Sequence, residues 1–295
     1  MADVPDDEAR TRAAGREHML PAASGRLLIC PAGRGDLTEV IRVLKLAGIS
    51  TRQRAALELY ATEPGSRVFT GSVRGRIVAT AQSASFGRTG WLGNVAVDPA
   101  WRNRRIGTTM STAAIGWLRE AGVRTILLTA TDLGKPVYER LGFDRDGVTY
   151  GIWTRAGLPR DAPSDMRCRS GSVETALLLD AEATGEDRSS YLRSFATRVR
   201  ETTAGPEAGY RIGLPWGGGP IVARDRHAGR ALVLDLLRHR PASALAFPDL
   251  NASAAEVARD LGFSRKRTVT RMHLGPPVDG FNHKLIFNVF SLAVG

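Results

Sequence analysis

The chain has 295 residues, of which 43% are hydrophobic and 24% are charged, as in ordinary globular proteins. No apolar run approaches the roughly 18 residues that span a bilayer, and the polar N-terminus lacks the basic-then-apolar pattern of a signal sequence, so we expect a cytoplasmic protein without a membrane partner. The net charge is +11, but the arginines are scattered and form no basic stripe, which argues against a nucleic-acid partner.

The first half of the chain predicts alternating strands and helices. Residues 1–25 lack apolar periodicity and predict a disordered leader. Leu27–Cys30 reads as a strand, and Asp36 with Glu39 predicts a capping box that opens a helix ending at Gly48. The other elements expected here are a helix from Ser50 and Gln53 to about Tyr60, strands at 67–72, 77–83 and 91–97 (the first two joined by a turn through Arg74 and Gly75), a helix at 106–121 capped by Gly122, a strand at 123–130, a helix at 136–141 and a strand at 148–155.

The second half follows a stretch that is rich in Gly, Pro, Ser and Asp. We interpret residues 157–172 as a linker between domains at 26–156 and 173–295. The elements expected in the second domain are helices at 173–183, 187–200, 228–239 and 252–261 and strands at 220–223, 245–247, 268–274 and 285–293.

One short sequence occurs in both halves. Leu141-Gly142-Phe143 recurs as Leu261-Gly262-Phe263, 120 residues later. Each copy follows an expected short helix and precedes an expected strand, so glycine suits the helix end. The matching order of elements around the two copies indicates a tandem duplication.

The two cysteines, Cys30 and Cys168, have no partner at metal-ligand spacing. We therefore expect free, buried or half-buried thiols and no metal site.

The segment from Val95 to Thr108 carries the clearest chemistry. An apolar strand ends at Asp98-Pro99, and a short basic loop leads at once into an amphipathic helix. The N-terminus of a helix offers unpaired N–H groups and a positive dipole end, which suit a pyrophosphate. Arg102, Arg104 and Arg105 add positive charge, and Gly107 allows a ligand to approach the backbone.

This segment resembles the coenzyme A loop of the GNAT N-acetyltransferase superfamily, whose pattern is Arg/Gln-x-x-Gly-x-Gly/Ala after such a strand. Arg102 matches the first position and Gly107 the last, whereas Arg105 stands where the family has its central glycine. That arginine either crowds the pyrophosphate or points outward and pairs with the phosphates of the cofactor. The residues that the resemblance assigns to acetyl-CoA are Val95, Ala96, Val97, Arg102, Asn103, Arg104, Arg105, Ile106, Gly107 and Thr108.

The resemblance also implies roles at the reacting atoms. Tyr138 precedes Leu141-Gly142-Phe143 at the family's spacing and would protonate the departing coenzyme A thiolate, although it also suits plain packing on its helix. Amides of Val95 and Val97 would hold the acyl carbonyl and the pantetheine. Asn94 either touches substrate or faces solvent at a bulge. Asp132 is a candidate general base, but capping of the helix at 136–141 is the reading we favour.

The second half resembles the C-terminal portion of tandem GNAT proteins, but it lacks the Arg-x-x-Gly-x-Gly loop, and Ala258 stands at the position of Tyr138. We interpret it as a degenerate, non-catalytic copy. Tyr210, Arg211 and Trp216 lie in an expected loop and are candidates for acceptor contact or plain surface residues.

The resemblance implies an α/β (α+β) protein with two tandem GNAT-like domains, each a mixed, mostly antiparallel twisted sheet flanked by helices. The expected function is transfer of acetyl from acetyl-CoA to a primary amine of a small molecule, without a metal, by a monomer or homodimer. The alternatives are a non-catalytic acyl-CoA-binding regulator and a basic RNA- or tRNA-associated protein.

Overall fold

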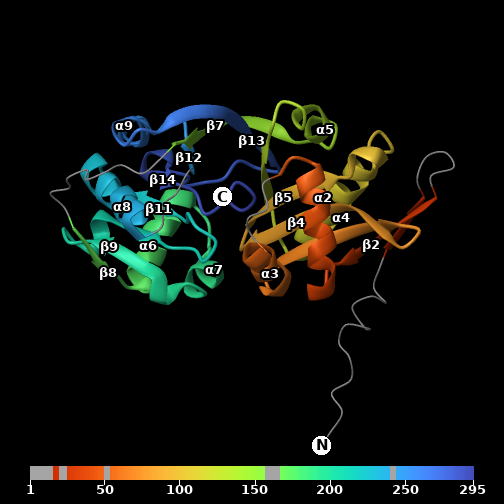
Figure 1. The fold of residues 1–295 in the computed structure, drawn as a ribbon, viewed down its shortest axis with the longest axis horizontal. Helices are drawn as coiled ribbons and strands as arrows, with labels where there is room; N and C mark the ends of the chain where they lie inside the picture. Colours follow the sequence, from red (N-terminus) through yellow and green to blue (C-terminus); the bar gives the residue numbers. More distant parts are fainter. Residues whose placement is uncertain (1–15, 20–24, 50–53, 157–166, 240–243) are drawn as a thin grey trace, which may run out of the picture. The chain divides into compact units, whose positions relative to one another are not determined.

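The structure is a computed structural model that describes residues 16–19, 25–49, 54–156, 167–239 and 244–295 (Figure 1). The chain forms two compact units. The first consists of the described residues up to Ser85 together with Gly90–Ile126, and the second consists of Phe86–Thr89 together with Leu127–Gly295.

The first unit is a meander of strands with helices packed on it. Its strands are neighbours in chain order, from β1 to β5, and β1 to β4 pair antiparallel. The elements are β1 (Arg16–Met19), β2 (Arg26–Pro31), a 3₁₀ turn (Arg34–Asp36), α2 (Leu37–Leu46), α3 (Arg54–Thr62), β3 (Ser66–Val73), β4 (Arg76–Phe86), β5 (Thr89–Val97), a 3₁₀ turn (Pro99–Trp101) and α4 (Ile106–Glu120).

Every strand and helix expected in this part of the sequence is present. Strand β1 was not expected, because it lies within the stretch predicted to be a disordered leader, and it forms by pairing with β2. The predicted hairpin joins β3 and β4, and its turn has positive φ at Arg74 and Gly75. The expected capping box is wrong: Asp36 makes no side-chain bond to the helix and instead accepts from the backbone N–H of Gly33 at 2.9 Å, and Glu39 pairs with Arg42. Ser50 and Gln53 lie outside the described residues.

Helix α4 packs on the sheet through one apolar stripe. Met110, Ala114 and Leu118 recur at helical spacing, and all three are fully buried. The helix approaches β3 so closely that a Cβ added to Gly71 would lie 2.7 Å from the sulfur of Met110. Full burial of a side chain such as Leu118 contributes about 1.5–3 kcal/mol, so this stripe holds the start of α4 firmly against the sheet.

The second unit contains two groups of strands. Strands β12 and β13 pair antiparallel with β7, and the strands of the other group also pair antiparallel with their neighbours. The strands β6, β13, β7 and β12 are neighbours in that order, and β14, β11, β10, β9 and β8 form a five-stranded sheet. The elements are β6 (Thr125–Ala130), α5 (Lys135–Glu139), β7 (Asp144–Thr154), β8 (Cys168–Ser170), α6 (Val173–Thr184), α7 (Ser189–Arg193), a 3₁₀ turn (Ala196–Arg198), β9 (Val199–Thr202), a 3₁₀ turn (Pro206–Ala208), β10 (Gly209–Ile212), β11 (Ile221–Ala223), α8 (Arg226–His239), β12 (Ala244–Pro248), α9 (Ala252–Asp260), β13 (Ser264–Leu274), a 3₁₀ turn (His283–Leu285) and β14 (Ile286–Asn288).

The second half departs from expectation in four places. Instead of a helix at 187–200, the chain forms the short α7, a 3₁₀ turn and then β9, because β9 finds partners in β8 and β10 that a helix would forgo. Strand β8 lies within the stretch expected to be a linker. Strand β10 was not expected, and the strand at 285–293 is reduced to β14.

Strands β7 and β13 lie side by side in Figure 1 and pair antiparallel over most of their length. Asp144 is opposite His273, and Thr154 is opposite Ser264. Each strand follows one copy of the repeated Leu-Gly-Phe, and because the strands are antiparallel, the two copies lie at opposite ends of the strand pair. Strand β7 also pairs with β12 on its other edge.

Candidate active site

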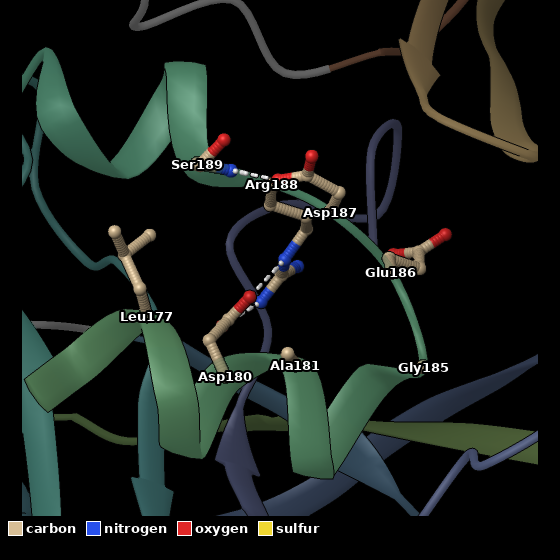
Figure 2. A pocket seen from close by; sticks show the side chains of 8 residues that line it. All are labelled: Leu177, Asp180, Ala181, Gly185, Glu186, Asp187, Arg188 and Ser189. Carbon is tan, nitrogen blue, oxygen red and sulfur yellow. Dashed lines mark hydrogen bonds and ion pairs between the residues drawn. The ribbon is translucent and has the colours of Figure 1, made fainter. Parts of the chain in front are cut away.

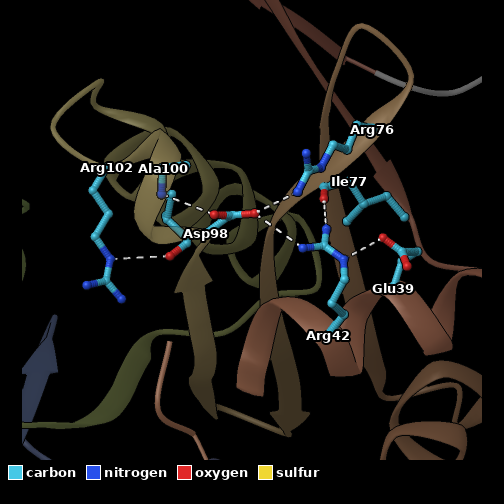
Figure 3. A network of polar contacts seen from close by, with 8 residues as sticks. Glu39, Arg42, Arg76, Ile77, Asp98, Ala100 and Arg102 are labelled. Carbon is cyan, nitrogen blue, oxygen red and sulfur yellow. Dashed lines mark hydrogen bonds and ion pairs between the residues drawn. The ribbon is translucent and has the colours of Figure 1, made fainter. Parts of the chain in front are cut away.

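The loop between β5 and α4 is anchored by a buried carboxylate. Asp98 accepts from the backbone N–H of Ala100 at 3.1 Å and from the guanidinium groups of Arg42 at 3.2 Å and Arg76 at 3.4 Å (Figure 3). Arg42 also donates to the carbonyl of Ile77 at 2.6 Å, which ties the loop to β4. Sequence reasoning treated Asp98 only as a strand end, although an Asp bonded to the N–H two residues on is a familiar turn.

The loop after this anchor contains two residues in the left-handed region. Asn103 has φ 62° and Arg105 has φ 59°. Arg105 directly precedes α4, and its side chain is exposed. The position at which the superfamily pattern has glycine therefore retains a glycine-like backbone here, and the arginine side chain points outward to solvent.

The N-terminus of α4 keeps its N–H groups available. The first turn contains no acidic residue, and the residue before the helix makes no side-chain cap. Arg102 turns back toward the strand and donates to the carbonyl of Val97 at 3.3 Å, whereas the guanidinium of Arg104 lies over the ring of Trp101, 4.9 Å from its centroid (Figure 3 shows Arg102). These cations and the helix terminus together form a site that suits a phosphate group.

The strand that leads into this loop opens to solvent near its middle. Gly93, Asn94 and Val95 are partly exposed, whereas Leu92 and Ala96 on either side are buried. Asn94 has φ 48°, a left-handed conformation that interrupts a regular strand. Its Nδ2 donates to Oε1 of Gln82 on β4 at 2.6 Å, so its side chain is paired with the neighbouring strand. The first unit thus brings together Asn94, the strand residues 95–97 and the loop residues 102–108.

Tyr138 lies in the second unit, on α5. Its half-buried ring packs edge-on against Phe143, with the ring centroids 5.8 Å apart. Burial raises the pKa of its hydroxyl to about 12, so the group keeps its proton throughout the neutral range. A protonated phenol is what a general acid requires.

Asp132, also in the second unit, is almost fully exposed and pairs with Lys135 at 2.7 Å. The expected capping role is wrong, because α5 starts after Gly134 without a side-chain cap. The hydrogen bond from Lys135 lowers the pKa of the carboxyl, which disfavours proton abstraction by Asp132 near neutral pH.

The candidate acceptor residues of the second half have structural roles. Tyr210 and Arg211 lie in the buried strand β10 and not in a loop. The Tyr210 hydroxyl donates to Asp180, and Arg211 donates to Asp235 at 2.6 Å. Trp216 packs edge-on against Phe195, with centroids 5.7 Å apart. Helix α8 begins at Arg226 without a loop like that of residues 102–105.

A pocket of about 380 Å³ lies beside α6 and the start of α7 in the second unit (Figure 2). Its floor is the buried ion pair of Arg188 and Asp180, joined by two hydrogen bonds, and Arg188 also donates to the carbonyl of Gly295 at 2.9 Å. Burial alone would lower the pKa of Arg188, but the Asp180 carboxylate outweighs it and raises the pKa. Because these charges satisfy each other, we assign the pair a structural role.

The described ranges contain no cluster of His, Cys, Asp and Glu able to hold a metal ion. Cys30 and Cys168 are half-buried and form no disulfide in the structure, and burial raises the pKa of Cys168 to about 11. None of the helices in the described parts of the chain has the length and apolar character needed to cross a membrane.

Two family models match the sequence. Residues 37–143 match the acetyltransferase (GNAT) family, and residues 176–287 match an acetyltransferase (GNAT) domain. No curated protein sequence matches the chain.

Solved structures of the same fold span nearly the whole chain. A proposed acetyltransferase from Pyrococcus horikoshii is 19% identical, with a TM-score of 0.80, and the match covers 95% of this chain and 99% of that one. A tandem GNAT protein from the clavulanic acid biosynthesis pathway is 17% identical, with a TM-score of 0.57 and coverage of 85% and 99%. A GCN5-related N-acetyltransferase from Sphaerobacter thermophilus is 14% identical, with a TM-score of 0.63 and coverage of 90% and 100%. At these identities the likeness establishes the fold.

Proposed function

Because the chain belongs to the GNAT acetyltransferase superfamily as a tandem-domain member, we propose that it transfers the acetyl group of acetyl-CoA to a primary amine of a small molecule. The superfamily assignment supports an acyl-CoA-dependent N-acetyltransferase in general. The identity of the donor and the class of acceptor are the added steps of this proposal.

The observation that carries the proposal is the N-terminus of α4. The helix presents unpaired N–H groups, has no acidic residue in its first turn and is preceded by three arginines. An anionic pyrophosphate fits this donor set, because backbone N–H groups and guanidinium groups both stabilise phosphate oxygens. The residues that would hold acetyl-CoA are Val95, Ala96, Val97, Arg102, Asn103, Arg104, Arg105, Ile106, Gly107 and Thr108.

The chemistry assigns a separate task to Tyr138. Bound acetyl-CoA supplies an activated thioester. A neutral amine attacks its carbonyl directly, the C–N bond forms, the C–S bond breaks, and the amine gives up its extra proton to water. The Tyr138 hydroxyl holds a proton at neutral pH and would pass it to the departing sulfur. Asp132 is not given the role of base, because its ion pair with Lys135 holds its pKa low.

We propose further that the first domain, residues 26–156, binds the cofactor and that residues 173–295 form a non-catalytic copy. The second half lacks the Arg-x-x-Gly-x-Gly loop before α8 and has Ala258 at the position of Tyr138. The compartment proposed is the cytoplasm, and the protein acts as a monomer or homodimer without nucleic acid.

Calorimetric titration with acetyl-CoA tests the cofactor site. The matched variants are Arg102→Ala, Arg104→Ala in the loop and Arg34→Ala, Arg124→Ala, which removes two exposed arginines elsewhere in the same unit. We expect micromolar binding by the wild type, roughly tenfold or greater weakening in the loop variant because two charge-assisted contacts are lost, and little change in the control.

Equal weakening in both variants would indicate general attraction to a +11 protein and would contradict a site in the loop. Binding without thiol release on any of a panel of amines would favour the non-catalytic regulator. Absence of binding to the wild type would remove the enzyme proposal.

A further inference from the structure

The face of β4 that points away from α4 carries two buried polar atoms that have no hydrogen-bond partner among the described residues. Ser83 donates to the carbonyl of Ala114 on α4 at 3.2 Å, so Ser83 faces that helix. Because successive strand residues alternate, Thr80 and Gln82 point to the opposite face. Both are 0% exposed, and neither the Thr80 hydroxyl nor Nε2 of Gln82 has a hydrogen-bond partner in the part of the chain that the structure describes.

Gln82 lies next to the point at which β5 opens. Its Oε1 accepts from Nδ2 of Asn94 at 2.6 Å, and this bond fixes which end of the Gln82 amide remains free. Asn94 is the residue with the left-handed backbone, and it stands directly before Val95 in the partly exposed stretch. The free Nε2 group is therefore buried beside the partly exposed stretch of β5.

An unpaired buried amide is costly. Leaving such a donor without a partner costs about 1–3 kcal/mol, and a ligand oxygen that accepts from it recovers this cost. The proposed function places the pyrophosphate at the loop from Arg102 and the acyl end at Val95 and Val97, so the acyl end would lie at β5 beside Asn94. The oxygen available at that end is the thioester carbonyl.

We propose that Gln82 donates a hydrogen bond from Nε2 to the carbonyl oxygen of the acyl group, and that Asn94 is the positioning residue that holds the Gln82 amide in this orientation. The inference rests on the proposed function, because it places the acyl end of acetyl-CoA at this gap. It distinguishes two ligands: acetyl-CoA carries the carbonyl oxygen, and free coenzyme A does not.

The first test compares the dissociation constants of acetyl-CoA and coenzyme A by calorimetry in Gln82→Met, which keeps the length of the side chain and removes its polar atoms. We expect acetyl-CoA to bind about three- to tenfold more weakly, as for the loss of one hydrogen bond, and coenzyme A to bind as to the wild type. Thr80→Val is the matched control, because it removes the other unpaired polar group of the same face. The ratio of the dissociation constants of acetyl-CoA and coenzyme A in Thr80→Val should match that of the wild type.

A second readout reports the bond directly. The infrared carbonyl stretch of bound acetyl-CoA labelled with ¹³C at the carbonyl is lowered by a hydrogen bond, so it should rise in Gln82→Met and stay unchanged in Thr80→Val. If Gln82→Met does not fold, Asn94→Gly, which accepts the left-handed backbone, and Asn94→Ala, which does not, carry the same comparison. Both variants lose the amide that orients Gln82, so the carbonyl stretching frequency should rise in both. An unchanged frequency would overturn the proposal.

The two proposals fail in different ways. A wild type that binds neither ligand contradicts the proposed function. A wild type that binds both, with a Gln82→Met variant that keeps the ratio of the two affinities and the carbonyl frequency, contradicts only the role of Gln82.

Discussion

At the scale of single residues, Arg105 combines an arginine side chain with a backbone that glycine adopts more readily. Its φ of 59° places Cβ close to the following carbonyl, at a cost of about 1–2 kcal/mol that glycine avoids. The fold accepts this cost at the entry to α4, where the exposed guanidinium adds positive charge beside the helix terminus. Strain retained at such a position is consistent with a binding role.

We expect Arg105→Gly to be more stable than Arg105→Ala by about 1 kcal/mol, because both remove the side chain and only glycine relieves the left-handed strain. Urea denaturation measures the difference. At Arg102, which has an extended backbone, the order should reverse, with alanine the more stable by about 0.4–1 kcal/mol. The same order at both positions would contradict the strain at Arg105.

Tyr138→Phe should slow acetyl transfer by about a hundredfold without changing the dissociation constant of acetyl-CoA, because it removes a proton donor and keeps the ring packed on Phe143. Since burial raises the pKa of this hydroxyl to about 12, its proton is present below that pH and is lost only above it. The wild-type rate should therefore show no alkaline loss due to Tyr138 between pH 7 and about pH 10. Thiol release across this range measures both effects, and a rate unchanged in Tyr138→Phe would exclude the role.

At the scale of elements, the repeated Leu-Gly-Phe forms the same turn twice. The N–H of Phe143 bonds the carbonyl of Tyr138 at 3.0 Å, and that of Phe263 bonds the carbonyl of Ala258 at 2.9 Å. Gly142 and Gly262 have φ of 86° and 79°, so both end their helices in the left-handed region. The local geometry is thus shared even though the residue at the tyrosine position differs.

Gly142→Ala and Gly262→Ala should each destabilise the protein by about 1 kcal/mol, because alanine disfavours positive φ. The nearest atoms to an added Cβ lie at 3.5 and 3.6 Å, so steric clash adds little and the two costs should be similar. Gly116→Ala, within α4 and in open space, is the opposite control and should stabilise by about 0.5–1 kcal/mol. Thermal and urea denaturation measure the stability of the three variants. A change of stability in the same direction for all three would contradict the left-handed backbone at Gly142 and Gly262.

At the scale of the whole molecule, the order of the chain and the order of the strands differ. Strand β7 precedes the stretch expected to be a linker, yet it pairs with β13 on one edge and β12 on the other, and both of these follow that stretch. A fragment that ends before residue 157 therefore leaves the edges of β7 bare, and the complementary fragment leaves β12 and β13 without it. Bare strand edges promote aggregation.

Residues 1–156 and 167–295 expressed separately should therefore be poorly soluble, and co-expression should recover a soluble complex. As a control, a protease site inserted within residues 157–166 of the intact protein should be cleaved after folding without separation of the two pieces in gel filtration. Fragments that are each soluble and melt cooperatively alone would contradict the importance of the β7 pairing.

Much of the site follows from local sequence. The strand that ends at Val97, the basic loop and the helix from Ile106 were all predicted from apolar periodicity and from proline and glycine signals, and the structure confirms these elements. Asn94 was recognised as unusual, but its partner Gln82 was missed, because a glutamine in an apolar strand gives no sign of the residue that it will meet 12 positions later. The Asp98 network was missed for the same reason.

The sequence by itself determined the superfamily, most of the helices and strands, and the position of the loop that suits a phosphate, since these depend on residues near one another in the chain. Tertiary structure decided that β7 pairs with β12 and β13, that residues 199–202 form a strand and not a helix, and that the Gln82 amide is buried beside Asn94. These features depend on which distant segments meet, because pairing and burial outweigh the modest preferences of individual residues.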